Sequence, residues 1–507
     1  MSTHTETATS APMRETAGHH DFVAVEDTSI TSLPDLAPGI EGVFLDEFQE
    51  CDCVVEATGN KLPDFLRGTY YLNGPARFGI GDVRYRHWLD GDGMISALNF
   101  DKDAIRLRSR YARSRKFTEE QEVGRALFRT FGTTFADSRL NRVHNGLESP
   151  VNVSVYPFAG RLLAFGEQGL PWELDPDTLA TLGQFNFAGR LNDASPFAAH
   201  PKFDPATGEM FNFGIFFSSQ SPRLYFYCFG PQGLRYRTAV PLEYPCSVHD
   251  FSLSKNYAVF YLSPYLLDAS RLLREGGTVM DCLEWRPERG SRLVVLARRT
   301  GELFASIPLG SRYCLHLINT FEEGGRLTVD VLEFDEPLYS NYQPVPALFQ
   351  KVSGGGPVRL AIDLHLRELV DRVALDFSKA PDFPAINPHH AMHAYDDFWM
   401  LGISSAGTDG RKFFDQLVHA NWRHSTVDDI YQCQPMRYLG GEPVFVGASH
   451  SDEGVIICQE FDASDRKSSF LIFESANITQ GPITRILVEH LMYLGFHAAF
   501  KVKSSGP

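Results

Sequence analysis

Cysteine is scarce in this sequence, with eight residues at irregular intervals in a chain of 507. Chains held together by disulfides are usually small, secreted and much richer in cysteine. Cys51 and Cys53 lie too close for a usual bridge, and no second pair is placed to complete a zinc site. The scarcity excludes a disulfide framework and predicts a reducing compartment, the cytoplasm.

Long apolar stretches are also missing. No run of about 18 apolar residues, the length that a spanning helix needs, occurs in the chain. The N-terminal segment lacks the apolar core of a secretory signal and contains glutamates that a transit peptide avoids. Residues 1–38, rich in Ser, Thr, Ala and Glu, are expected to form a disordered or loosely attached tail.

Positive charge is in deficit, with 47 Lys and Arg against 63 Asp and Glu and a net charge of −16. No basic stripe is available to neutralise phosphates, which excludes a nucleic-acid partner. The acidic surface is expected to serve solubility, and no feature indicates an obligate protein partner.

Short apolar runs separated by turn residues are abundant. Segments such as 209–217 and 326–334 read as β-strands, and DP, GG, GP and NG dipeptides lie between such runs. Helical spacing of apolar residues is found mainly in 117–131 and 264–277. This balance predicts an all-β propeller or large barrel, in a single domain over residues 39–507.

Four widely separated histidines, each beside a predicted strand, are the strongest candidates for chemistry: His200, His249, His316 and His497. They are 49, 67 and 181 residues apart. Ligands so scattered can meet only where several strands converge on one axis, as the inner strands of propeller blades do. Four neutral imidazoles leave a divalent iron its full charge and can leave positions open for oxygen chemistry. We therefore expect Fe(II) at the centre of a radial β-structure.

The remaining histidines are expected to be ordinary. In NPHHAMH, His389 and His393 have the spacing of two ligands on one helical face, with His390 between them. No carboxylate base accompanies them, and Pro388 indicates a loop or an edge. His87 is expected to pack within the turn-forming segment HWLDGDG.

The segments around these residues resemble the carotenoid cleavage oxygenases, which are non-haem iron enzymes that cut polyenes. GTYYLNGPARF (68–78) and YRHWLDGDGMI (85–95) match the opening signature of the family. The histidine segments AHPKFDPATGE, HDFSLSKNY, HLINTFEE and GFH follow in family order, so the resemblance runs from about residue 40 to the C-terminus. It implies a seven-bladed β-propeller with a cap of loops and short helices over one face. It also implies that the four histidines are the iron ligands.

The family places carboxylates on the far nitrogens of three ligand imidazoles. The resemblance assigns Glu167 to His249, Asp382 to His316 and Glu442 to His497, and leaves His200 without a partner. Such a carboxylate fixes the tautomer and the ring angle of the ligand. Asp382 stands where the family has a glutamate and is one methylene shorter. Either the backbone lies closer there, or a water bridges the gap, or the contact is absent.

The resemblance also implies a reaction, in which dioxygen adds across one carbon–carbon double bond of a conjugated substrate and two carbonyl products form. Stilbene-cleaving members hold a phenol with a Lys and a Tyr at positions that are Gly166 and Phe117 here. The missing polar groups favour a carotenoid or apocarotenoid over a hydroxystilbene. The 39 phenylalanines suit an apolar tunnel, and residues 264–267 either contact a membrane surface peripherally or pack between cap and propeller.

Two other functions stay open. One is isomerisation without oxygen, which nothing in the sequence selects. The other is a non-catalytic propeller that binds partners on its faces. Such a scaffold has no need of histidines at four inner positions, and it should purify without stoichiometric iron.

Overall fold

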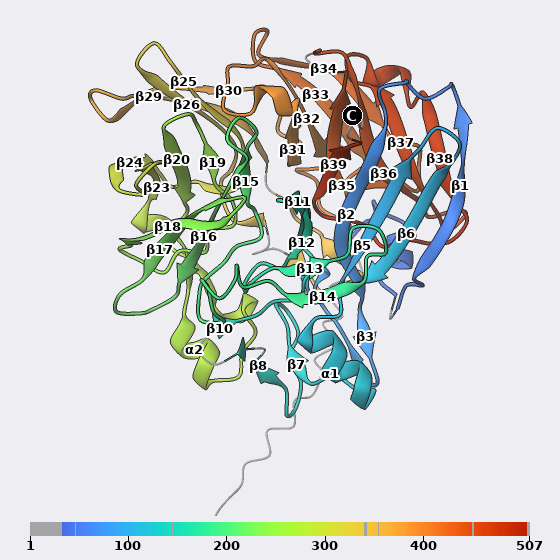
Figure 1. The fold of residues 1–507 in the computed structure, drawn as a ribbon, viewed down its shortest axis with the longest axis horizontal. Helices are drawn as coiled ribbons and strands as arrows, with labels where there is room; N and C mark the ends of the chain where they lie inside the picture. Colours follow the sequence, from blue (N-terminus) through green and yellow to red (C-terminus); the bar gives the residue numbers. More distant parts are fainter. Residues whose placement is uncertain are drawn as a thin grey trace, which may run out of the picture.

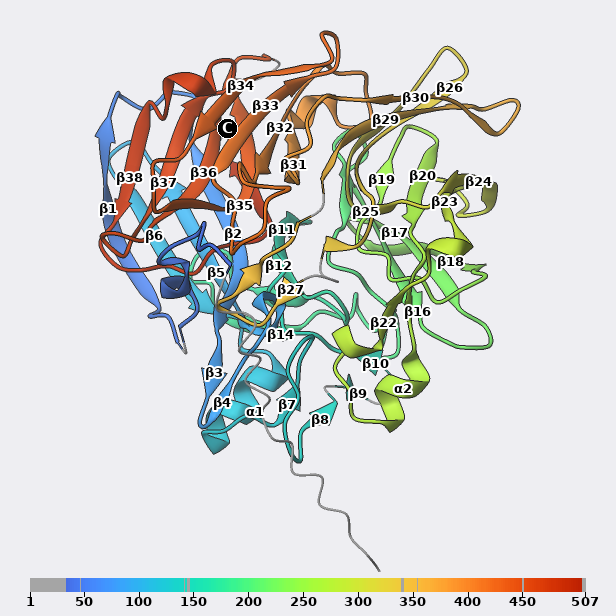
Figure 2. The same ribbon diagram turned by 180° about the vertical axis from the view of Figure 1, so that it is seen from behind.

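The computed structural model of the chain describes residues 33–45, 47–140, 142–143, 146–338, 342–352, 354–448 and 451–503. Nearly all regular structure in these ranges is β-strand, and neighbouring strands pair antiparallel with a single two-residue exception. The sheets follow one another around the centre of the molecule in the order of the sequence (Figures 1 and 2). The expectation of an all-β, propeller-like fold is confirmed.

Five sheets of the described residues have four strands each. They are β11–β14 (Ser154–Phe158, Arg161–Phe165, Trp172–Leu174, Thr181–Gln184); β15–β18 (Lys202–Asp204, Glu209–Phe216, Arg223–Gly230, Gly233–Pro241); β19, β20, β23 and β24 (Ser252–Leu253, Tyr257–Leu262, Ser291–Ala297, Leu303–Gly310); β25, β26, β29 and β30 (Tyr313–Glu323, Arg326–Phe334, Gly355–Asp363, Glu368–Ala374); and β31–β34 (Asp382–Ile386, Asp397–Gly402, Gln416–Asn421, Thr426–Gln432).

A sixth, nine-stranded sheet joins the two ends of the chain. Its order is β35 (Arg437–Gly447), β36 (Gly454–Asp462), β37 (Lys467–Glu474), β38 (Thr484–Val488), β1 (Cys51–Gly59), β6 (Ile105–Tyr111), β5 (Asp92–Phe100), β2 (Gly68–Arg77) and β39 (Ala498–Val502). One half of β1 pairs with β38 and the other half with β6. The described sheets therefore do not form seven separate blades, as the sequence resemblance implied. β1 fuses strands from both chain ends into one sheet beside five smaller ones.

Apart from the two α-helices, the remaining described secondary structure consists of two-stranded sheets and short 3-10 turns. The two-stranded sheets are β3 (Gly79–Ile80) with β4 (Val83–Arg84), β7 (Phe128–Arg129) with β8 (Arg139–Leu140), β9 (Arg142–Val143) with β10 (Gly146–Leu147), β21 (Tyr265–Leu267) with β22 (Leu283–Trp285), and β27 (Tyr342–Gln343) with β28 (Leu348–Phe349). The 3-10 turns are η2 (Ile40–Val43), η3 (Trp88–Asp90), η4 (Met280–Cys282), η5 (Pro287–Arg289), η7 (Pro388–His390) and η8 (Ile478–Gln480).

Burial along the strands explains why so many of them read as apolar runs. β16 and β20 are buried almost throughout, because side chains on both of their faces are covered. The edge strand β30 is exposed along nearly its whole length and has the charged sequence ELVDRVA. Aromatic rings contribute to the packing of β16 against β20: the ring of Phe213 lies 5.4 Å from that of Phe251 and 5.3 Å from that of Phe260.

The helix α1 (Arg115–Val123) is shorter than the helical spacing over 117–131 predicts. The Ser114 side chain accepts a hydrogen bond from the Phe117 N–H and starts the helix. Gly124, in the left-handed region at φ 67°, ends it. In Figures 1 and 2, α1 lies with α2, β7 and β8 at one edge of the molecule.

The helix α2 (Ala269–Arg274) covers only the middle of the predicted segment 264–277. Before it, Tyr265 and Leu267 belong to β21 and are buried. Packing inside the protein therefore accounts for most of this apolar stretch and supports the second of the two alternatives for residues 264–267. No helix of the described residues has the length and apolarity to cross a bilayer.

A cluster of buried charges fastens α1 to the nine-stranded sheet. Lys116 Nζ lies 2.9 Å from Glu120 Oε2 and 3.1 Å from Asp92 Oδ1, and it donates to the Tyr85 hydroxyl over 2.8 Å. Arg77 lies 2.6 Å from Asp92, and all four charged side chains are at most 2% exposed. Burial opposes the charge of Lys116, but Asp92, Tyr85 and Glu120 outweigh it and raise its pKa. These residues form the α1 charge cluster.

The start of the described chain is tied to the body of the protein. Asp35 forms an ion pair with Arg411, the Leu36 N–H donates to the Arg411 carbonyl, and Ala37 is fully buried. Residues 35–37 are thus attached by named contacts. Most of the predicted tail, residues 1–32, lies outside the described residues.

Candidate metal centre

The four predicted histidines meet at one place. His200 lies just before β15, His249 before β19 and His497 before β39, whereas His316 lies inside β25 rather than beside a strand as expected. One ligating nitrogen from each ring lies within 4.8 Å of the others. Among the described residues this is the one group of three or more ligating side chains that could hold a metal ion.

The rings surround a common point. The Nε2 atoms of His200 and His249 are 2.8 Å apart. The ring centroid of His200 lies 4.3 Å from those of both His249 and His497, and His316 lies 5.0 Å from His497. The Nε2 atom of His316 is buried, and no atom of the described residues is its hydrogen-bond partner. A buried polar atom left so is costly, and a metal ion is a partner that this position can take.

Irregular backbone aims these side chains inward. The pairing of β25 with β26 shifts register between Cys314 and Leu317 and again between Leu317 and Asn319. Bulges of this kind redirect a side chain, here that of His316. The backbone of His497 is held on both sides, because its N–H donates to Val153 O and its carbonyl accepts from the Asn73 N–H, each over 3.1 Å.

Three carboxylates lie against the outer nitrogens of three of the imidazoles. The Nδ1 atoms of His249, His316 and His497 are 2.9, 2.5 and 3.3 Å from Glu167 Oε2, Asp382 Oδ1 and Glu442 Oε2. The structure thus brings together the pairs that the sequence resemblance assigns, and none of these carboxylates serves His200. A carboxylate at Nδ1 holds the proton there and leaves Nε2 bare.

The short Asp382 side chain contacts His316 directly, so neither a water bridge nor an absent contact is needed. The register of β31 against β32 shifts between Asp382 and Ala385. Inside this bulge Phe383 has a φ of 54°, a conformation that bulky residues rarely adopt. The Phe383 N–H donates to Asp382 Oδ1 over 2.8 Å. The strained bulge therefore fixes the shorter carboxylate beside His316.

The tendency to carry a proton differs among the groups of the site. Burial and then the neighbouring histidines lower the pKa values of His200 and His497 well below the usual range, so both rings are neutral at pH 7. Burial also disfavours charge on His316, but Asp382 outweighs it and raises the pKa of that ring. Burial raises the pKa of Glu442 to about 7.

These residues fit a divalent first-row metal. One nitrogen from each of four imidazoles converges on this place, and two of the rings are held neutral. Among the described residues, the buried Nε2 atom of His316 has no hydrogen-bond partner. Imidazole is a good ligand for Fe, Zn, Cu and Ni, so the donor set permits iron without selecting it.

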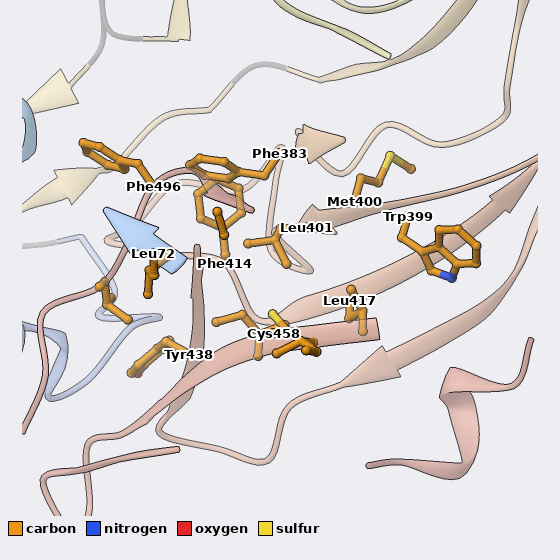
Figure 3. Packing of buried hydrophobic residues seen from close by; sticks show 14 of the residues in the cluster. Leu72, Phe383, Trp399, Met400, Leu401, Phe414, Leu417, Tyr438, Cys458 and Phe496 are labelled. Carbon is orange, nitrogen blue, oxygen red and sulfur yellow. The ribbon is translucent and has the colours of Figure 1, made fainter. Parts of the chain in front are cut away.

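Aromatic side chains lie beside the histidines. The ring of Phe383 lies 5.8 Å from His316 and 5.3 Å from His497. Phe414 and Phe496 pack on Phe383 at 5.8 and 6.4 Å, and Figure 3 shows the three rings grouped together. An apolar wall next to the metal centre follows from these contacts. Sequence reasoning missed these rings, because phenylalanine is frequent throughout the chain.

Gly166 and Phe117, the two positions weighed for phenol binding, are differently placed. A Cβ atom on Gly166 would lie 2.4 Å from the Pro150 carbonyl oxygen and 2.5 Å from Ser149 Oγ. A lysine next to Glu167 is therefore excluded unless that backbone moves. Phe117 is a residue of α1 whose ring stacks on Tyr111. The case against a phenol-binding lysine therefore depends on Gly166.

The other histidines weighed from the sequence and described by the structure do not belong to this centre. His390 Nε2 lies 2.6 Å from Asp452 Oδ1, and His393 Nδ1 lies 2.9 Å from the Ala391 carbonyl oxygen. His389 shares the turn η7 with His390, and none of the three belongs to the metal-ligating group found among the described residues. His87 caps η3 by accepting a hydrogen bond from the Leu89 N–H.

Comparison with known proteins gives the site its context. Apocarotenoid-15,15'-oxygenase of Synechocystis is 27% identical over 469 residues, which cover 89% of this chain and 94% of that protein. Resveratrol cleavage oxygenase 1 of Aspergillus fumigatus is 34% identical, over 87% of this chain and 90% of that protein. The crystal structure of cobalt-substituted Synechocystis apocarotenoid oxygenase superposes with a TM-score of 0.84 at 25% identity, over 93% of this chain and all of that one.

A family model covers nearly the whole described region. The model of the retinal pigment epithelial membrane protein matches residues 44–502. The histidine segments that resemble the carotenoid cleavage oxygenases all lie within this match. The protein is therefore a member of the retinal pigment epithelial membrane protein family, together with the carotenoid cleavage oxygenases.

Proposed function

We propose that this protein is an Fe(II)-dependent dioxygenase that splits one carbon–carbon double bond of a carotenoid or apocarotenoid. The convergence of one nitrogen from each of four imidazoles beside an aromatic wall carries this proposal. In a balanced reaction, one double bond and one O₂ give two carbonyl groups, and each product receives one oxygen atom. The names of the Synechocystis relative and of its cobalt-substituted form support both the substrate class and a metal at the centre.

The side chains of the protein would position the metal and keep water away from the substrate. They would not transfer protons to the substrate. A ferrous ion held by His200, His249, His316 and His497 would supply the activation of dioxygen. Glu167, Asp382 and Glu442 would hold three of these imidazoles in the ligating tautomer. Phe383 and its neighbours would exclude water from the apolar chain of the substrate.

A second candidate is cleavage of a stilbene. The 34% identity to resveratrol cleavage oxygenase 1 favours it. Gly166 opposes it, because no lysine fits at that position to hold a phenol. We therefore place the apolar polyene first.

The finer architecture belongs to the same proposal. Divided at β1, where the two halves of that strand face different partners, the nine-stranded sheet becomes two blades and the total becomes seven. The helices α1 and α2 with their neighbouring short strands would be the cap. Residues 39–507 would then form one domain. The eight cysteines are all free, which supports a reducing compartment, the cytoplasm.

Loss of the Asp382 carboxylate tests the role of the shortened partner. The Asp382→Ala variant should bind Fe(II) about 10–100-fold more weakly, because the His316 tautomer and ring angle are no longer fixed. Competition with a chelator measures the affinity. Asp397→Ala is the matched control, since Asp397 pairs with His419 at the surface over 3.0 Å. Wild-type affinity in Asp382→Ala would contradict the assignment.

Metal exchange and a substrate panel test the function itself. The protein is stripped with a chelator, reloaded with Fe(II) or Zn(II), and supplied with carotenoids, apocarotenals and resveratrol under ¹⁸O₂. We expect Fe(II) alone to restore cleavage, and mass spectrometry to find label in both carbonyl products of an apocarotenal. Equal recovery with zinc would refute the redox role. Cleavage of resveratrol alone would select the second candidate.

A further inference from the structure

A buried carboxylate links three of the four histidine-bearing segments. Asp250 follows His249 directly and is 3% exposed. We propose that Asp250, together with Lys202, is a positioning residue that holds His200, His249 and His316 at the spacing that the metal requires. The proposal rests on the metal site of the proposed function and adds to it a residue that binds neither metal nor substrate.

The contacts of Asp250 reach two other sheets. Its Oδ2 atom accepts a hydrogen bond from the backbone N–H of Leu317 over 3.0 Å, which ties it to β25 beside His316. Its Oδ1 atom lies 2.8 Å from Lys202 Nζ, in β15, two residues after His200. The second contact is an ion pair without the alignment of a hydrogen bond.

This arrangement places one rigid group between three separate sheets. β15, β19 and β25 belong to three different four-stranded sheets, and the bulges of β25 beside His316 weaken its own pairing there. The Leu317 N–H lies at this irregular point, so Asp250 supplies the acceptor that fixes it. His497 has other supports, because the Glu442 carboxylate also accepts the Ala498 N–H over 3.2 Å.

Three variants separate the contribution of the Asp250 hydrogen bond to Leu317 from that of its ion pair with Lys202. Asp250→Ala removes both links, Asp250→Asn keeps an acceptor for Leu317 but loses the charge, and Lys202→Met leaves only the hydrogen bond. We therefore expect the largest effect from the alanine variant and intermediate effects from the other two. Losing an outer partner of a metal site typically costs about 10–100-fold in metal affinity, which sets the scale for Asp250→Ala.

Cobalt(II) is the probe, because its visible absorption reports the geometry of its ligands independently of turnover. The wild-type protein and the three variants are titrated with cobalt in competition with a chelator, and the spectra of the loaded proteins are compared. Asp250→Ala should bind cobalt at least about 10-fold more weakly, with a changed spectrum. Asp204→Ala is the matched control: Asp204 is also a buried carboxylate of β15 in an ion pair, with Arg298, and should leave affinity and spectrum unchanged.

The outcomes separate this inference from the proposed function. If Asp250→Ala has the same cobalt affinity and the same spectrum as Asp204→Ala, the inference is overturned. Should the alanine variant not fold, wild-type affinity in both Asp250→Asn and Lys202→Met would overturn it instead. A wild-type protein that binds cobalt and loads iron but cleaves no substrate refutes only the proposed reaction. A wild-type protein that takes up no metal refutes both.

Discussion

His316→Ala is expected to purify without iron and to cleave no substrate above background. The variant loses the imidazole whose Nε2 is buried and lacks a protein partner. Because His316 is itself a proposed ligand, we expect its affinity for Fe(II) to fall by at least about 100-fold, the upper end of the cost of losing an outer partner.

The same change also disturbs the carboxylate behind the ring. Burial opposes the charge of Asp382, and His316 outweighs it and keeps the pKa of Asp382 below the usual range. Without the imidazole, that compensation disappears and Asp382 is left buried with its partner removed. A second loss, in stability, should therefore accompany the loss of metal, and a thermal melt detects it.

A matched histidine gives the control for this experiment. His390→Ala removes a ring that pairs with Asp452 outside the metal centre. It should keep wild-type iron content, measured by metal analysis, and wild-type cleavage. Iron loss in His390→Ala, or its retention in His316→Ala, would move the metal site from the four histidines to the NPHHAMH segment.

Lys116→Met should lower the free energy of unfolding by about 3–5 kcal/mol, the usual cost of removing one partner of a buried ion pair. Methionine fills much of the lysine volume, so the change removes charge more than packing. Asp92 and Glu120 then keep only Arg77 as a counter-charge in the α1 charge cluster. Urea denaturation followed by tryptophan fluorescence measures the loss.

Two further variants isolate the electrostatic origin of that loss. Lys467→Met breaks the exposed pair with Glu489, in which the side chains are 51% and 82% exposed, and should cost at most about 1 kcal/mol. Glu120→Gln keeps an acceptor for the backbone N–H groups of Leu127 and Phe128. Added to Lys116→Met, it should recover part of the stability, because one uncompensated charge is gone. Additive losses in the double variant would contradict this explanation.

The grouping of the four histidines could be predicted from the sequence, because a metal centre needs particular side chains in recognisable segments. Which strands pair with one another could not be predicted from the sequence. β1 has the sequence CDCVVEATG, in which charged and small residues interrupt the apolar ones, so it does not read as an apolar run. Its two-sided pairing depends on which strands lie alongside it in space.

The irregular backbone at the site could not be predicted from the sequence either. His316 was expected beside a strand, yet it lies within β25, where bulges in the pairing with β26 turn it inward. Asp382 reaches His316 because Phe383 has a positive φ. Nothing in the sequence predicts this conformation for an aromatic residue. Both features are set by pairing across strands, which residue type alone does not encode.

The shared sheet also imposes an order on biosynthesis. β1 and β2 leave the ribosome long before their partners β38 and β39. The ring therefore stays open until those strands emerge, and His497, directly before β39, is the last of the four imidazoles to arrive. A nascent chain stalled before residue 484 would be both unclosed and unable to complete the four-histidine site.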